Sequence, residues 1–164
     1  RKVKNYTNNI IKSERKANKM EKKIIIVTGA SRGIGKEIAK TLAKEGHTVI
    51  ANYNKSEKEA QKLKEELKKE NKEIEIYKAD ISKEEEIKKM VEYTIKKYKK
   101  IDILINNAGI DKIQLSTEVT KKDWDEIINT NLYGTFYITQ QVTKNMIQNK
   151  KGKVINISSI FFTL

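Results

Sequence analysis

Residues 24 to 35 read Ile-Ile-Ile-Val-Thr-Gly-Ala-Ser-Arg-Gly-Ile-Gly, and this segment constrains the possible fold more than any other part of the chain. Four apolar residues with high β-propensity predict a buried strand of a parallel sheet. The three glycines predict a tight turn, and the amphipathic pattern after them predicts a helix. Such an arrangement presents backbone N–H groups and a positive helix end to a phosphate. The segment therefore predicts a nucleotide site in an α/β fold.

Candidate strands and helices alternate along the rest of the chain. Strands are predicted over residues 24–28, 48–53, 74–79, 101–106 and 154–158. Helices are predicted over residues 33–45, from Ser56 to about 71, after a capping Ser82, from near Thr120, and over residues 131–149. Strands joined by right-handed helical crossovers form a doubly wound parallel sheet. We expect a Rossmann-like α/β fold with strand order 3-2-1-4-5.

The net charge of +13 divides into two parts. Residues 1–19 hold seven Lys or Arg and one Glu without clear periodicity, which predicts a disordered basic arm or sequence upstream of the true start. Contact of this arm with nucleic acid is the alternative. The folded part, residues 20–164, keeps +7, spread along helices and mixed with Glu, which favours solvated helical faces over a nucleic-acid surface.

Composition also excludes several classes of site. The chain has no cysteine, which excludes disulfides and thiolate metal sites. No cluster of His, Asp and Glu has metal-ligand spacing, so no metal is expected. No apolar run approaches the roughly 20 residues that span a bilayer. We therefore expect a soluble, cytoplasmic protein without a membrane partner.

Five motifs resemble those of the short-chain dehydrogenase/reductase family. Thr28–Gly35 resembles the family's T-G-x-x-x-G-I-G, and Asn106–Gly109 matches its N-N-A-G. Asp80 follows the third predicted strand, where the family has an adenine-side aspartate. Asn129–Leu132 resembles the N-x-N-L segment with the active-site asparagine, and Ile155–Ser159 resembles the fifth-strand segment that ends in the catalytic serine. The resemblance covers about residue 22 to residue 160.

The resemblance implies roles for individual residues. Those expected to bind the cofactor are Gly29, Ser31, Arg32, Gly33, Ile34 and Gly35 at its phosphates, Asn54 after the second strand, Asp80 and Ile81 at its adenine, and Asn107, Ala108 and Gly109 at the nicotinamide ribose. Two simpler interpretations stay open: Asn106 only links the fourth strand to its neighbour, and Asp80 only ends a strand.

The end of the second strand bears on the choice of cofactor. NAD enzymes usually place an acidic residue there to accept a hydrogen bond from the ribose 2′-hydroxyl. This chain has Asn52-Tyr53-Asn54-Lys55 and no carboxylate. Arg32 lies in the glycine-rich turn, where NADP-preferring family members often have a basic residue, and its planar fork suits a phosphate. We expect NADP(H) rather than NAD(H); an Arg32 that only faces solvent is the alternative.

The catalytic residues are matched only in part. The family reduces carbonyls with a Tyr-x-x-x-Lys pair, supported by a serine and an asparagine, which correspond here to Ser159 and Asn131. The chain ends at Leu164, before the tyrosine and lysine are expected. Tyr93 and Lys97 have the same spacing, but they lie on the helix between strands three and four, and we interpret them as an ordinary helical pair.

The resemblance implies an NADP(H)-dependent reductase, most like the 3-oxoacyl-[acyl-carrier-protein] reductases of fatty acid biosynthesis. A small-molecule or carrier-bound carbonyl compound would be the substrate, and the complete protein would form a homotetramer or homodimer. We expect this chain to be C-terminally incomplete, lacking later strands and helices, and inactive. The alternatives are a dinucleotide-binding fragment without catalysis, and a reductase of another carbonyl, such as one that modifies a translation factor. Trp124 is expected to pack against the sheet or its neighbours.

Overall fold

The computed structural model describes residues 21–158, so the predicted arm (residues 1–19) and the predicted catalytic Ser159 lie outside the described residues. Five parallel strands form one sheet in the order β3-β2-β1-β4-β5. The strands are β1 (Ile24–Val27), β2 (Thr48–Tyr53), β3 (Glu75–Lys78), β4 (Ile103–Asn106) and β5 (Lys153–Asn156). The helices are α2 (Gly33–Lys44), α3 (Glu57–Lys69), α4 (Glu84–Tyr98), α5 (Lys121–Ile128) and α6 (Thr135–Gln148). The predicted fold class and strand order are confirmed.

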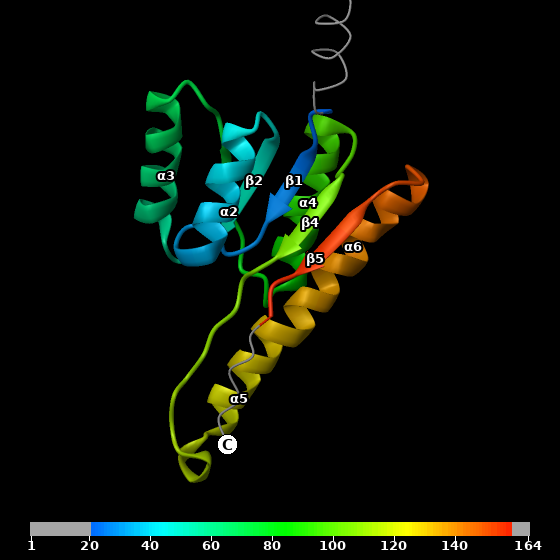
Figure 1. The fold of residues 1–164 in the computed structure, drawn as a ribbon. Coiled ribbons are helices and arrows are strands. Elements are labelled where there is room, and N and C mark those ends of the chain that lie inside the picture. The colour runs from blue at the N-terminus through cyan, green and yellow to red at the C-terminus, as the bar shows by residue number, and fades with distance from the viewer. Residues whose placement is uncertain (1–20, 159–164) are drawn as a thin grey trace, which may run out of the picture.

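The two faces of the sheet are buried by different helices (Figure 1). Because side chains alternate along a strand, Ile24 and Ile26 of β1 pack toward α4 and α6, whereas Ile25 and Val27 pack toward α2 and α3. All four side chains of β1 are buried, which explains the uninterrupted apolar run that the sequence shows there. The central strand therefore joins two hydrophobic cores.

The amino-terminal edge of the sheet is tied together by two buried polar side chains. Oδ2 of Asp102 accepts a hydrogen bond from the Ile24 N–H at 2.8 Å, and Oδ1 of Asn145 accepts one from the Ile101 N–H at 3.0 Å. These bonds satisfy the backbone donors of Ile24, the first residue of β1, and of Ile101, two residues before β4. Strand β4 accordingly begins at Ile103, two residues later than the apolar pattern predicts.

Two local predictions about helix ends have different outcomes. Helix α5 begins near Thr120 as expected, and Thr120 caps it: its side chain accepts from the Asp123 N–H while the Asp123 carboxylate accepts from the Thr120 N–H. The prediction that Ser82 caps α4 is wrong: Lys83 precedes the helix, and it makes no side-chain cap. The Ser82 hydroxyl donates instead to Oδ1 of Asp80 at 2.7 Å.

The long helix predicted over residues 131–149 has a different beginning in the structure. Residues Asn129–Gly134 are wound as a π-helix that connects α5 directly to α6. Gly134 is buried, and a Cβ at this position would collide with the carbonyl oxygen of Ile81. The missing side chain therefore lets this part of the helix lie against the segment that follows β3, a contact between distant parts of the chain.

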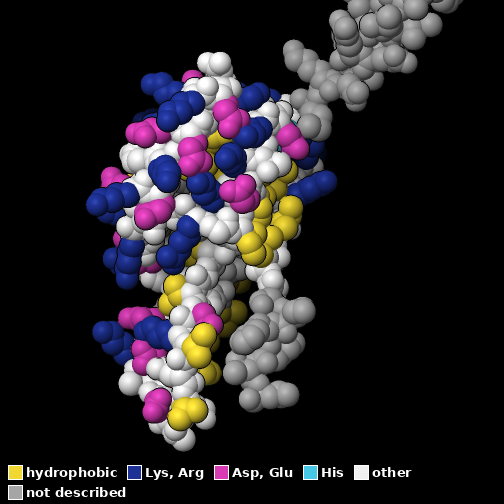
Figure 2. All heavy atoms as spheres, turned by 60° about the vertical axis from the view of Figure 1, so that its left-hand side comes forward, with side chains coloured by type: hydrophobic (Ala, Val, Ile, Leu, Met, Phe, Trp, Pro, Cys, Tyr) yellow, Lys and Arg dark blue, Asp and Glu magenta, His cyan; other side chains and the backbone are white. Residues whose placement is uncertain are grey.

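Several apolar side chains remain exposed. Trp124 on α5 is 61% exposed, so most of its side chain does not pack against the sheet or its neighbours, contrary to the prediction. Ile155 of the edge strand β5 and Ile157 after it are also exposed. Figure 2 shows hydrophobic side chains gathered on the main body and along its lower extension, and Lys mixed with Glu over much of the rest of this side. Among residues 21–158, no helix has the length and apolar character needed to cross a membrane.

Candidate functional site

The glycine-rich turn lies at the carboxyl end of β1, beside the carboxyl end of β2. Gly29 has φ +64°, a value that favours glycine, and the chain reverses there into α2. The turn is held by Asn52 of β2: its carbonyl oxygen accepts from the Ala30 N–H at 2.8 Å, and its Oδ1 accepts from the Gly29 N–H at 3.4 Å. The side-chain amide of Asn52 donates to the carbonyl oxygen of Ala79 at 2.9 Å. Asn52 thus joins three strand ends.

Thr28 connects the same turn to the segment after β4. Its Oγ1 accepts hydrogen bonds from the backbone N–H groups of Asn107 and Ala108, both at 3.0 Å. In return, the Asn107 side-chain amide donates to the carbonyl oxygens of Thr28 and Gly29, at 3.0 and 3.2 Å. The carboxyl ends of β1 and β4 are therefore locked together. The strand order reverses between these two strands, and open α/β sheets bind their ligands at such a point.

Two glycines permit the close packing of this region. A Cβ on Gly29 would lie 2.8 Å from Cα of Ala108, and a Cβ on Gly35 would collide with Nδ2 of Asn107 and the carbonyl oxygen of Gly29. Only glycine leaves room at both positions. The glycine-rich turn and the start of α2 therefore pack directly against Asn107 and Ala108, and such close packing is characteristic of dinucleotide-binding turns. The residues present therefore fit a dinucleotide.

The amino-terminal end of α2 is suited to an anion. Arg32 occupies the N-cap position without a side-chain hydrogen bond to the helix, and the first turn contains no acidic residue. Gly33 and Ile34 are exposed there, and Ser31 is buried beside them. Within residues 21–158, Arg32 forms no salt bridge with a carboxylate. The helix dipole and the guanidinium are thus both available to a negatively charged group.

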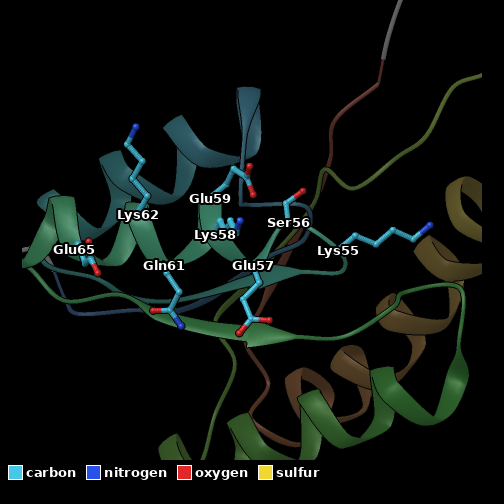
Figure 3. Close-up of a pocket in the computed structure, with 8 residues that line it drawn as sticks. All are labelled: Lys55, Ser56, Glu57, Lys58, Glu59, Gln61, Lys62 and Glu65. Carbon is cyan, nitrogen blue, oxygen red and sulfur yellow. The ribbon is translucent and has the colours of Figure 1, made fainter.

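The segment after β2 contains both lysine and glutamate side chains, unlike the amino-terminal turn of α2, which has no acidic residue. Figure 3 shows the residues that line a cavity here, all from one stretch between positions 55 and 65, with Lys55 pointing away from the helical residues. Glu57 and Glu59 lie in the first turn of α3 and oppose an anion at that helix end. Lys55 forms no salt bridge within the described residues, so it joins Arg32 as a second available cation at this edge.

Asp80 and Ile81 follow β3 at the same edge of the sheet. Partial burial raises the pKa of Asp80, but hydrogen bonds from Ser82 and Asn54 outweigh it and hold the pKa below its usual value. Oδ1 of Asp80 accepts from both the N–H and the hydroxyl of Ser82. Asn54 and Asp80, both predicted for the cofactor, thus lie near each other at this edge of the sheet.

Asn131 lies on the π-helix and faces the segment after β4. Its side chain accepts from the Ile110 N–H and donates to the Ile110 carbonyl oxygen, both at 2.9 Å. Gly109 lies close by, since a Cβ there would be 3.5 Å from Oδ1 of Asn131. The predicted ribose-contacting segment and the predicted active-site asparagine therefore meet at the carboxyl edge of β4.

Asn106 does link β4 to its neighbour. Its amide donates to Oδ1 of Asn156 on β5 and to the hydroxyl of Thr139 on α6, both at 2.9 Å. Its own Oδ1 is buried and has no hydrogen-bond partner within the described residues. Ser158, the residue before the predicted catalytic serine, is exposed just beyond β5.

Tyr93 and Lys97 lie at the amino-terminal end of β3, at the opposite end of the strands from the glycine-rich turn. Both bind the carboxylate of Glu75, the first residue of β3, and the Lys97 ammonium lies 2.9 Å from it. The pair therefore fixes the end of α4 against an edge strand, as expected of an ordinary helical pair. Among residues 21–158, no group of three or more His, Asp or Glu side chains could hold a metal ion.

Comparisons with known proteins agree with this geometry. The family described as short chain dehydrogenase matches residues 23–162. Relatives include 3-oxoacyl-[acyl-carrier-protein] reductases of Staphylococcus epidermidis, 41% identical, and of Staphylococcus aureus, 38% identical, each matched over 84% of this chain. This chain spans only 57% and 56% of their respective lengths.

Solved structures give the same result. A crystal structure of an actinorhodin polyketide ketoreductase with NADPH superimposes with a TM-score of 0.79 and 33% identity, over 84% of this chain and 53% of that one. A Serratia marcescens short-chain dehydrogenase/reductase has the same TM-score with 28% identity, over 87% of this chain and 58% of that one.

Proposed function

Because this chain belongs to the short-chain dehydrogenase family, we propose that it is the cofactor-binding part of an NADP(H)-dependent carbonyl reductase. The observation that carries the proposal is the set of hydrogen bonds between Thr28 and Asn107, which holds the glycine-rich turn at the point where the strand order reverses. The related ketoreductase solved with NADPH supports the choice of cofactor.

Different residues of the candidate site would contact different parts of the dinucleotide. The first N–H groups of α2, with Ser31, hold the pyrophosphate, and Arg32 binds the 2′-phosphate. Asp80 and Ile81 hold the adenine. Asn107, Ala108 and Gly109 support the nicotinamide ribose. The dinucleotide, when bound, supplies the hydride.

The substrate side of the site rests on fewer residues. Asn131 fixes the backbone of Ile110 beside the ribose-contacting segment, and it is the predicted active-site asparagine. Ser159, which would polarise the substrate carbonyl, directly follows the described residues. A 3-oxoacyl group on a carrier is the proposed substrate, because the relatives from both Staphylococcus species are named for that reaction. The homo-oligomeric state and the cytoplasmic location stay predictions.

Replacing Arg32 by alanine is expected to weaken NADPH binding about tenfold while leaving NADH binding nearly unchanged. The guanidinium has no carboxylate partner among the described residues, and a hydrogen bond between charged groups contributes about 1.5–3 kcal/mol. Fluorescence titration with each cofactor measures the effect. Arg32→Lys keeps the charge but loses the planar fork and should give an intermediate affinity. An equal loss for both cofactors would show that Arg32 does not select the 2′-phosphate.

Activity separates the reductase from the second candidate, a dinucleotide-binding chain without catalysis. The only Tyr-x-x-x-Lys in the sequence is Tyr93–Lys97, which is bound to Glu75 on the opposite edge of the sheet. We expect the 164-residue chain to bind NADPH but not to oxidise it in the presence of an acetoacetyl thioester. Absorbance at the nicotinamide band follows the reaction, and a Tyr93→Phe variant is the control. Turnover that Tyr93→Phe abolishes would assign catalysis to this pair and contradict the expectation.

A further inference from the structure

A second cavity, of about 540 Å³, lies at the edge of the sheet opposite the glycine-rich turn. It is formed at the amino-terminal ends of β2 and β3, which lie at the opposite end of the strands from the candidate cofactor site (Figure 1). Five lysines line it. Lys97 on α4 is paired with Glu75, and the other four come from three segments: Lys22 before β1, Lys64 and Lys68 on α3, and Lys72 between α3 and β3. We call this cavity the lysine pocket.

The positive charge of the lysine pocket is not neutralised by its surroundings. None of the four lysines lies within 4.0 Å of a carboxylate oxygen in the described part of the chain. Glu75 also lines the pocket, but its carboxylate accepts hydrogen bonds from Tyr93, Tyr98 and Lys97 and is thereby compensated. Glu73 is the other acidic residue of the lining. The pocket therefore keeps an excess of positive charge.

The rest of the lining gives the pocket an apolar floor. Val49 at the start of β2 and Ile74 before β3 are buried and line it, and the ring of Tyr98 lies at one side. Its volume is within the range of about 300–1,000 Å³ that is usual for small-molecule sites. The larger cavity of Figure 3 differs in that it is lined by one segment, where Glu57, Glu59 and Glu65 balance three lysines.

We propose that the lysine pocket binds a small molecule that carries two or more phosphate groups. Four ammonium groups around one cavity match several negative charges, whereas a single carboxylate would leave most of them unpaired. The lysines come from different elements, so a ligand between them contacts α3 and the start of the sheet together. This inference does not depend on the proposed function, because the candidate cofactor site lies at the other end of the strands.

Pyrophosphate is the probe, added to the ¹⁵N-labelled chain with NADPH present in excess so that the glycine-rich turn is occupied. We expect backbone amide signals of Thr48, Ile74 and Glu75 to shift. The double variant K64Q/K68Q should bind pyrophosphate at least about tenfold more weakly, since it removes two charge-assisted contacts. Its melting temperature and NADPH affinity should stay unchanged, because both side chains are exposed.

The control is K89Q/K96Q, which removes two exposed α4 lysines that neither line the pocket nor form a salt bridge in residues 21–158. It should bind pyrophosphate within about twofold of the unchanged chain. Equal weakening in both double variants, or shifts confined to Ser31–Gly35, would overturn the proposal. Tighter binding of a short DNA duplex than of pyrophosphate, lost in K64Q/K68Q, would also overturn it in favour of a nucleic-acid surface.

Discussion

Replacing Gly35 by alanine is expected to destabilise the chain by about 3 kcal/mol and to weaken NADPH binding about 100-fold. The new Cβ collides with the carbonyl oxygen of Gly29 and with the side-chain amide of Asn107. Neither can move away cheaply, because the first is backbone and the second donates two hydrogen bonds. Urea unfolding measures the free energy of unfolding, and fluorescence titration measures the NADPH affinity.

Gly46→Ala is the matched control for this variant. Gly46 lies just after α2 with φ +92°, and a Cβ there meets no atom within 4 Å. The control therefore tests backbone strain without a collision, and we expect a loss of about 1–2 kcal/mol with NADPH affinity retained. If Gly46→Ala costs as much as Gly35→Ala, close packing at the glycine-rich turn is not the reason for the effect.

Thr28→Val is expected to cost about 2–4 kcal/mol, although the two side chains have nearly the same shape. The hydroxyl accepts from two part-buried backbone N–H groups, and an unsatisfied donor costs about 1–3 kcal/mol when it is fully buried, so the lower part of that range applies to each. NADPH binding should weaken as well, because Asn107 and Ala108 lose the contact that fixes them to β1. Urea unfolding and the same titration report both effects.

Thr28→Ser keeps the hydroxyl and removes only a methyl group, so it should cost no more than about 1 kcal/mol and preserve NADPH affinity. A valine variant as stable as the serine variant would mean that the hydroxyl does not hold the two strand ends together. The pair of variants thereby separates the hydrogen bonds from the packing of the same side chain.

Much of the fold follows from local patterns in the sequence. The limits of β2 are those that the apolar run predicts, and α5 begins at Lys121, next to the predicted start near Thr120. The predicted cap of α4 is wrong because the Ser82 side chain has a different hydrogen-bond partner. Ser82 is a good capping residue by type, but the Asp80 carboxylate two residues earlier accepts from both its N–H and its hydroxyl.

The candidate site was predictable in its position but not in its internal contacts. The motif residues at the carboxyl ends of β1, β3 and β4 are brought to one edge, as the alternation of strands and helices indicates. The sequence does not predict the roles of Thr28 and Asn52, because their partners are distant along the chain. The Thr28 hydroxyl binds Asn107 and Ala108, which follow it by 79 and 80 positions. The Asn52 amide binds Ala79, which follows it by 27 positions. A single sequence shows that both residues are polar ends of apolar strands, and that signal alone does not identify a partner.

The π-helix has a consequence for how α5 and α6 are related. An α-helix turns by about 100° per residue, whereas a π-helix turns less, so six residues of π-helix shift the angular phase between the flanking helices. Asn131 thereby faces Ile110 while Ile138 and Val142, about two and three turns further on, face the core. The π-helix therefore lets one continuous helical segment present side chains in different directions at its two ends, so that each end contacts a different part of the protein.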